Sequence, residues 1–149
     1  MSLSRDILLG NRKVYICYDY DNDRNYRSLL FSLTKNSRFS LSFSDDIFKD
    51  FIYSDIGNIK AALAKKIGES THTLVVVGKD ANTLHRDHNI IGHKNWFNYE
   101  IAKSKEFGKK IVAVKIDPKF ESPEQLLSSK VKWVKSLNID EIIDAIDNR

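Results

Sequence analysis

The sequence predicts an α/β protein with an open, flavodoxin-like parallel sheet of four to five strands and helices on both faces. Three continuous apolar runs, at residues 14–18, 74–77 and 111–114, are largely β-branched, as strands buried on both faces are. Stretches with the spacing of amphipathic helices separate these runs. Alternation of strand and helix indicates a parallel sheet, because right-handed crossovers return each connecting helix onto the sheet.

The stretch at residues 39–44 predicts a strand at the edge of that sheet. Phe39, Leu41 and Phe43 alternate there with three serines. A period of two is typical of a strand with one wet face, and an edge position is the simplest place for it. Residues 131–134 predict a short further strand.

Four apolar patterns predict helices between and after the strands. They are Tyr26, Leu29, Leu30 and Leu33; Ile56, Ile59, Leu63 and Ile67; the stretch 96–108; and Ile139, Ile142, Ile143 and Ile146. Gly108 stands where a helix stops, and Asn138 with Glu141 resembles a capping box. Pro123 is expected at the first position of another helix.

Length and composition favour one domain over residues 1–149, with residues 1–11 as an N-terminal extension. The single cysteine, Cys17, excludes an internal disulfide framework and a zinc site with several cysteines. No apolar run approaches the ~18 residues of a membrane span, and the N-terminal run is too short for a signal peptide. We therefore expect a cytoplasmic protein with no membrane partner. A net charge of +4 is too small to indicate nucleic-acid binding.

Candidate binding residues follow the first two predicted strands. In wound sheets, ligands bind beyond the carboxyl ends of the strands, where the winding direction changes. Tyr18 and Asp19 stand at the end of the first strand, and Phe43 and Asp45 at the end of the second. Their position makes them candidates, although ordinary loop and strand-end roles explain them equally well.

The helix after the third strand begins with an aromatic residue and a carboxylate on one face. Trp96 and Glu100 are four residues apart, which is about one helical turn. A carboxylate can accept hydrogen bonds from the vicinal hydroxyls of a ribose, and an indole can form a stacking wall beside it. Tyr99 precedes Glu100 and is a candidate for the same pocket.

These residues resemble motifs of TIR domains. Residues 95–101, Asn-Trp-Phe-Asn-Tyr-Glu-Ile, resemble the Trp-x-x-x-Glu motif of TIR domains that cleave NAD. Residues 14–21, Val-Tyr-Ile-Cys-Tyr-Asp-Tyr-Asp, resemble the first TIR box, with Cys17 in place of the usual serine. Residues 72–79 and 106–115 extend a resemblance that covers roughly residues 12–117 and is strongest to TIR-like proteins of Thoeris-type anti-phage systems. The Arg-Asp-x-Pro-Gly loop of animal signalling TIR domains is absent between Asp45 and Ile59.

The resemblance implies an enzyme that breaks the bond between nicotinamide and ribose in NAD+, with NAD+ as substrate and no further cofactor or metal. Glu100 would be the catalytic carboxylate. The remaining substrate-binding candidates are Trp96, Tyr99, Tyr18, Asp19, Phe43 and Asp45. The resemblance favours a cyclic ADP-ribose-type product over linear ADP-ribose. It also implies a homo-oligomer, an effector that senses the product and a phage-derived trigger.

Other interpretations stay open. The chain could be a non-catalytic TIR-like interaction or scaffold module. Glu100 could pair with Lys103 on a solvated helix face, Trp96 could be a core residue, and Tyr99 could be a half-buried surface aromatic.

Two further patterns have weaker functional interpretations. Asp19, Asp21, Asp23 and Lys115 resemble the acidic cluster and lysine of phosphoacceptor receiver domains, but Gly78 stands where a receiver needs an aspartate. The histidines His85, His88 and His93, with Asp87 beside them, are interpreted as polar loop residues rather than zinc ligands. Gly78-Lys79 lacks the upstream glycine of a phosphate-binding loop.

Overall fold

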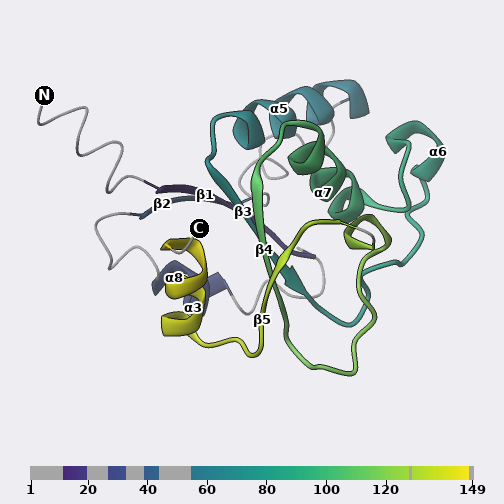
Figure 1. The fold of residues 1–149 in the computed structure, drawn as a ribbon. Coiled ribbons are helices and arrows are strands. Elements are labelled where there is room, and N and C mark those ends of the chain that lie inside the picture. The colour runs from purple at the N-terminus through teal and green to yellow at the C-terminus, as the bar shows by residue number, and fades with distance from the viewer. Residues whose placement is uncertain (1–11, 20–26, 33–38, 44–54, 128, 148–149) are drawn as a thin grey trace, which may run out of the picture.

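A five-stranded parallel sheet forms the centre of the chain (Figure 1). The computed structural model describes residues 12–19, 27–32, 39–43, 55–127 and 129–147, with residues 27 and 28 described by their backbone alone. The elements are β1 (Arg12–Cys17), α3 (Arg27–Phe31), β2 (Phe39–Phe43), α5 (Ile56–Gly68), β3 (His72–Val77), α6 (His88–Ile91), α7 (Trp96–Glu106), β4 (Lys110–Lys115), the 3-10 turn η3 (Glu124–Leu126), β5 (Lys132–Val134) and α8 (Ile139–Asp147). The predicted fold class is confirmed, while the predicted extension at residues 1–11 lies outside the described residues.

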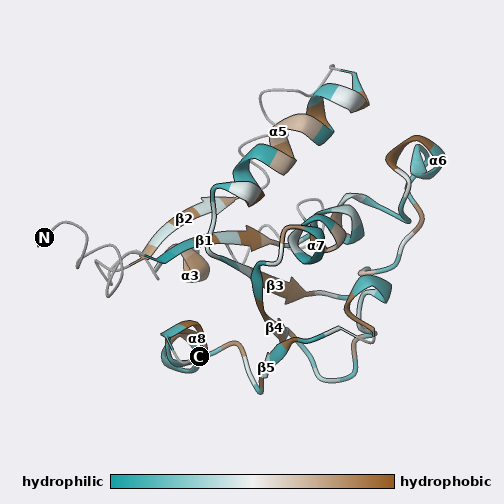
Figure 2. Ribbon diagram, turned by 45° about the horizontal axis from the view of Figure 1, so that its top comes forward, coloured by the Kyte–Doolittle hydropathy of each residue, from teal (hydrophilic) through white to brown (hydrophobic). Residues whose placement is uncertain are grey.

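The strand order β2-β1-β3-β4-β5 explains the sequence patterns. All four neighbouring pairs are parallel. Every residue of the central strand β3 is buried, and Figure 2 shows this strand as strongly hydrophobic. β2 forms one edge, as its alternation predicts, and its Ser40 is exposed while Phe39 and Phe43 are buried. The short strand β5 forms the other edge.

Helices cover the sheet in two layers. α5 and α7 lie on one face, and α3 and α8 lie on the other (Figures 1 and 2). β1 contributes alternate residues to the two layers, because successive side chains of a strand point to opposite faces. Tyr15 and Cys17 pack in the core under α5 and α7. Val14, Ile16 and Tyr18 pack in the core of the α8 face.

Local capping sets where α7 begins and ends. The Asn95 side chain accepts a hydrogen bond from the Asn98 amide at 2.8 Å, which caps the first turn. Gly108, with φ +68°, lies just beyond the helix in the left-handed region that favours glycine. The predicted helix at residues 96–108 is therefore confirmed, with its regular part ending at Glu106.

The other two predicted helix starts differ in detail. The Glu141 amide donates to Asn138 Oδ1 at 3.1 Å, but the Glu141 carboxylate accepts from the Ser136 hydroxyl at 3.0 Å instead of returning to Asn138, so half of a capping box forms. The expected helix with Pro123 at its first position is wrong. Pro123, with ψ 142°, is extended and precedes only the three-residue turn η3.

None of the helices in the described part of the chain combines the length and the apolar character needed to cross a membrane.

Candidate functional site

Glu100 is a buried carboxylate between α7 and the sheet. Its side chain is 1% exposed, and Tyr15 of β1, which is fully buried, donates its hydroxyl to Glu100 Oε1. The alternative of a solvated pair with Lys103 is wrong, because Lys103 Nζ binds Glu106 Oε2 at 2.8 Å. A buried carboxylate group needs hydrogen-bond partners to offset its lost hydration, and Tyr15 is one of them.

A row of β1 side chains lies beside Glu100 under α7. Cys17 Sγ lies 3.7 Å from the Phe97 carbonyl oxygen, to which its thiol donates. Burial raises the pKa of the Cys17 thiol well above its ordinary value, and the negative charges of Glu100 and Asp19 raise it further. Both carboxylates are thus close enough to act on the thiol, which stays protonated at neutral pH. The row consists of Tyr15 and Cys17, and Asp19 follows two residues beyond the end of β1.

Trp96 and Tyr99 form an aromatic pair at the start of α7. Trp96 is half-buried, and its ring centroid lies 5.5 Å from that of Tyr99 in an edge-to-face arrangement. Tyr99 is buried, in contrast to the half-buried alternative, and its hydroxyl donates to the Lys60 carbonyl at 3.2 Å. Burial raises the pKa of Tyr99. The ammonium groups of Lys60 and Lys103 each lie 5.8 Å from the Tyr99 ring centroid.

The remaining predicted residues do not join this group. Tyr18 and Phe43 pack in the core of the opposite face, where their ring centroids are 6.2 Å apart. They therefore belong to a different core cluster from the buried residues of α7. Asp45 lies outside the described residues, as do Asp21 and Asp23. A substrate-binding role for Tyr18 and Phe43 stays a prediction.

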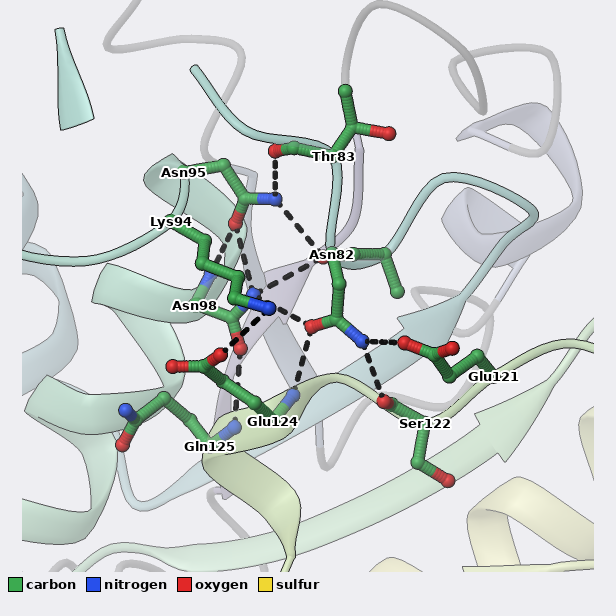
Figure 3. A network of polar contacts seen from close by, with 10 residues as sticks. Asn82, Thr83, Lys94, Asn95, Asn98, Glu121, Ser122, Glu124 and Gln125 are labelled. Carbon is green, nitrogen blue, oxygen red and sulfur yellow. Dashed lines mark hydrogen bonds and ion pairs between the residues drawn. The ribbon is translucent and has the colours of Figure 1, made fainter.

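A buried asparagine anchors the first turns of α7. Asn98 is fully buried, and its Nδ2 lies 3.1 Å from the Ala81 carbonyl, 3.2 Å from Asn82 Oδ1 and 3.1 Å from Asn95 Oδ1. Its Oδ1 accepts from the Gln125 amide at 3.1 Å. One side chain thereby joins the segment after β3, the start of α7 and η3 (Figure 3).

Asn82 extends this network toward the segment after β4. Its Nδ2 donates to the Ser122 carbonyl at 2.9 Å and to the Glu121 carboxylate, and its Oδ1 accepts from the Glu124 amide at 2.8 Å (Figure 3). Lys94 and Glu124 form an ion pair at 3.1 Å beside it. Sequence reasoning missed this network. The only local signal was the pair Asn95 and Asn98, which has the spacing of a helix cap.

The three histidines lie in and around the short helix α6, and His88 is its first residue rather than a loop residue as predicted. His85 Nδ1 accepts from the Asp87 amide at 2.9 Å, and His88 Nδ1 contacts the His85 carbonyl at 3.0 Å. Burial lowers the pKa of His93, whose ring packs against Tyr99 at 5.9 Å. Within the described segments, no three His, Cys, Asp or Glu side chains gather closely enough to hold a metal ion.

The family to which this parallel sheet and its helix layers belong is shown by a match of sequence. Residues 15–120 match the family described as "Thoeris protein ThsB, TIR-like domain". The chain belongs to this family, and the predicted resemblance is confirmed. It is thus a TIR-like protein of a defence-related kind, and this membership excludes the receiver-domain interpretation.

Solved structures with the same fold include proteins of different activities. A prokaryotic SEFIR domain is 14% identical with a TM-score of 0.58, covering 92% of this chain and 96% of its own. A 2-deoxyribosyltransferase from Bacillus psychrosaccharolyticus is 11% identical with a TM-score of 0.61, covering 87% of this chain and 90% of its own. At such identities these likenesses concern the fold alone. No curated protein matches the sequence.

Proposed function

We propose that the chain is an NAD+-cleaving enzyme of the ThsB family, with Glu100 as its catalytic carboxylate. The observation that carries the proposal is the burial of Glu100 against the sheet, with Tyr15 donating to it. A glutamate with only a surface role would be solvated, and an isolated buried carboxylate is costly. Buried acids with specific partners near the carboxyl edge of a wound sheet are typical of functional sites.

The chemistry requires little more than this carboxylate. The C1′–N bond of the nicotinamide riboside unit breaks with its electron pair going to the pyridinium nitrogen, so nicotinamide leaves as a neutral molecule. No general acid is needed, unlike in ordinary glycoside hydrolysis. The Glu100 carboxylate would accept hydrogen bonds from the ribose hydroxyls and, when ionised, stabilise the positive charge that develops on the ribosyl carbon.

The aromatic pair supports the same substrate. Half-buried Trp96 offers an indole wall one helical turn from Glu100, and the ring of buried Tyr99 packs edge-to-face against that indole. The ammonium group of Lys60 adds positive charge beside Tyr99, which suits a dinucleotide with a pyrophosphate. Water captures the ribosyl cation to give ADP-ribose, with loss of a proton, whereas an adenine nitrogen captures it to give a cyclic isomer. We favour the cyclic product as a signal for a separate effector.

The proposal requires that the substrate can reach the buried Glu100 carboxylate. Because Glu100 is 1% exposed, a ribose reaches its carboxylate only after the side chains above it move. Such an opening fits an enzyme that is switched on by assembly or by a phage-derived trigger, and lid movements of this kind govern turnover in many enzymes.

The same burial favours a second candidate, a non-catalytic interaction module. In that case the bond from Tyr15 to Glu100 serves only to hold α7 on β1. The function then depends on surface residues, and the chain turns over no NAD+ under any condition.

An NAD+ turnover assay distinguishes the two candidates. Nicotinamide release and product masses are measured for the wild type, Glu100→Gln and Glu106→Gln, both as purified protein and in lysate from phage-infected cells. Glu106 is the matched control, because it is an acid on the same helix that pairs with Lys103 at the surface. We expect Glu100→Gln alone to lose activity, by about a hundredfold or more, as for loss of a group that stabilises developing charge.

Two outcomes would overturn the enzyme proposal. One is full turnover by Glu100→Gln. The other is a wild type that is silent in both settings, which favours the interaction module. The presence or absence of a water's mass in the product separates linear from cyclic ADP-ribose.

A further inference from the structure

A second concave site lies at the β5 edge of the sheet, apart from Glu100. It is a cavity of about 490 Å³ lined by Lys115, Ser122, Leu126, Leu127, Ser129 and Trp133. Lys115 ends β4 and Trp133 lies in β5, and the other four residues come from the segment that joins these strands. None of the residues assigned to NAD+ cleavage lines it. The cavity has the size of a small-ligand site and lies beside β4 and β5, away from the place between β1 and β3 where the winding direction changes.

The cavity is lined by one aromatic ring, that of Trp133, and by one positively charged side chain, that of Lys115. Trp133 is 45% exposed, which is a large exposed fraction for a tryptophan, a residue that is highly buried on average. Lys115 Nζ lies 5.8 Å from the Trp133 ring centroid, at the outer limit of a cation–π contact. Lys115 forms no ion pair with any acidic side chain in the part of the chain that the structure describes.

One wall of the cavity is held in place before any ligand arrives. The asparagine network fixes the backbone of Ser122 through Asn82 and that of Gln125 through Asn98 (Figure 3). The Ser129 hydroxyl donates to the Gln125 carbonyl at 2.9 Å. A wall that is already ordered loses little entropy on binding, which favours affinity.

We propose that this cavity binds a nucleoside 5′-monophosphate group, with the base on Trp133 and the phosphate on Lys115. An indole face stacks on any nucleobase, because every base has a π-face. The Lys115 ammonium group and the Ser122 hydroxyl can donate hydrogen bonds to phosphate oxygens, whereas the Ser129 hydroxyl already donates to the Gln125 carbonyl. The Lys115 ammonium leaves the indole at small cost, since an exposed cation–π contact is weak, and the base takes its place. Leu126 and Leu127 disfavour a bare, strongly hydrated anion in the same space.

The proposal stands independently of NAD+ cleavage and is tested by calorimetric binding of AMP. The variants are Trp133→Ala, Trp133→Phe and Lys115→Met. Lys132→Met is the charge-matched control, because Lys132 is exposed on β5 and its side chain points to the opposite face from its neighbour Trp133. Glu100→Gln reports on the proposed catalytic site.

We expect Trp133→Ala and Lys115→Met each to weaken AMP binding at least tenfold. Trp133→Phe, which keeps a ring, should recover part of the affinity and shows that the alanine variant did not simply misfold. Lys132→Met and Glu100→Gln should bind AMP as the wild type does. Adenosine should bind more weakly than AMP and be insensitive to Lys115→Met.

Four results would overturn the proposal. The first two are no AMP binding by the wild type and unchanged AMP binding by Trp133→Ala. The third is an equal loss of affinity in Lys132→Met, which indicates a general charge effect. The fourth is a loss of affinity in Glu100→Gln, which places AMP in the other site. Because binding is measured without turnover, a failed NAD+ assay leaves these results interpretable.

Discussion

Removing the hydroxyl of Tyr15 tests the central contact of the candidate site. Tyr15→Phe deletes a single oxygen from a fully buried ring and leaves the packing of that ring in place. The Glu100 carboxylate then loses a donor in a position where it is only 1% exposed. A hydrogen bond to a charged group contributes about 1.5–3 kcal/mol, so the free energy of unfolding should fall by that amount.

A double-mutant cycle isolates this interaction from other effects. The second substitution is Glu100→Met, which keeps the length of the side chain and removes both acceptor oxygens. In that background Tyr15→Phe should cost about 0.5 kcal/mol or less, which leaves a coupling of roughly 1.5–3 kcal/mol. Urea unfolding followed by circular dichroism at neutral pH measures all four proteins.

The control for the cycle is Tyr99→Phe, which removes a bond to the neutral Lys60 carbonyl. Its cost should be about 0.5–1.5 kcal/mol and should not depend on Glu100. A coupling between Tyr15 and Glu100 within about 0.5 kcal/mol of zero would refute the reasoning, because the two groups would then not share a buried, charge-assisted hydrogen bond.

Two further predictions concern the supports of the fold. Burial first, and then the charges of Lys110 and Arg12, lower the pKa of His72 from 6.5 to about 4. Between pH 6.5 and about 4, His72 of the unfolded chain therefore binds a proton that His72 of the folded chain does not. The free energy of unfolding is therefore unaffected by His72 above pH 6.5 and falls as the pH drops toward 4, by about 1–2 kcal/mol after allowance for solvent screening. Urea unfolding at several pH values should show a smaller fall for His72→Asn. An identical pH dependence of the two proteins would contradict this. Asn98→Ala leaves the Gln125 amide without its acceptor and should lower the free energy of unfolding by about 2–4 kcal/mol, whereas a loss below about 1 kcal/mol would mean that the network does not anchor α7.

Local patterns were sufficient for most of the architecture. The apolar runs predicted β1, β3 and β4, residues 131–134 predicted β5, and the serine alternation of β2 predicted its place at an edge. The spacing of Trp96 and Glu100 predicted the helix that carries both, and Gly108 predicted where it ends. These features depend on residues a few positions apart, so periodicity and capping chemistry are enough to find them. The helix start predicted from Pro123 was wrong, because a proline is equally suited to the extended residue before a short turn.

The contacts that make the candidate site were decided by the tertiary structure. The period of a strand shows that Tyr15 and Tyr18 point to opposite faces, but it does not show which face α7 covers. That depends on how the crossovers pack, and it brings Tyr15 to Glu100 across 85 residues of chain while placing Tyr18 in the other core. The asparagine network likewise joins segments far apart in the sequence.

The sequence by itself thus determined the strands, the longer helices, their alternation and the family, because each depends on short-range patterns. Only the tertiary structure decided that Glu100 is buried with Tyr15, that Asn98 holds α7 to η3, and that Lys115 and Trp133 line one cavity. The physical reason is that burial and pairing belong to surfaces that meet after the chain has folded, and no residue's neighbours along the chain reveal what will cover it.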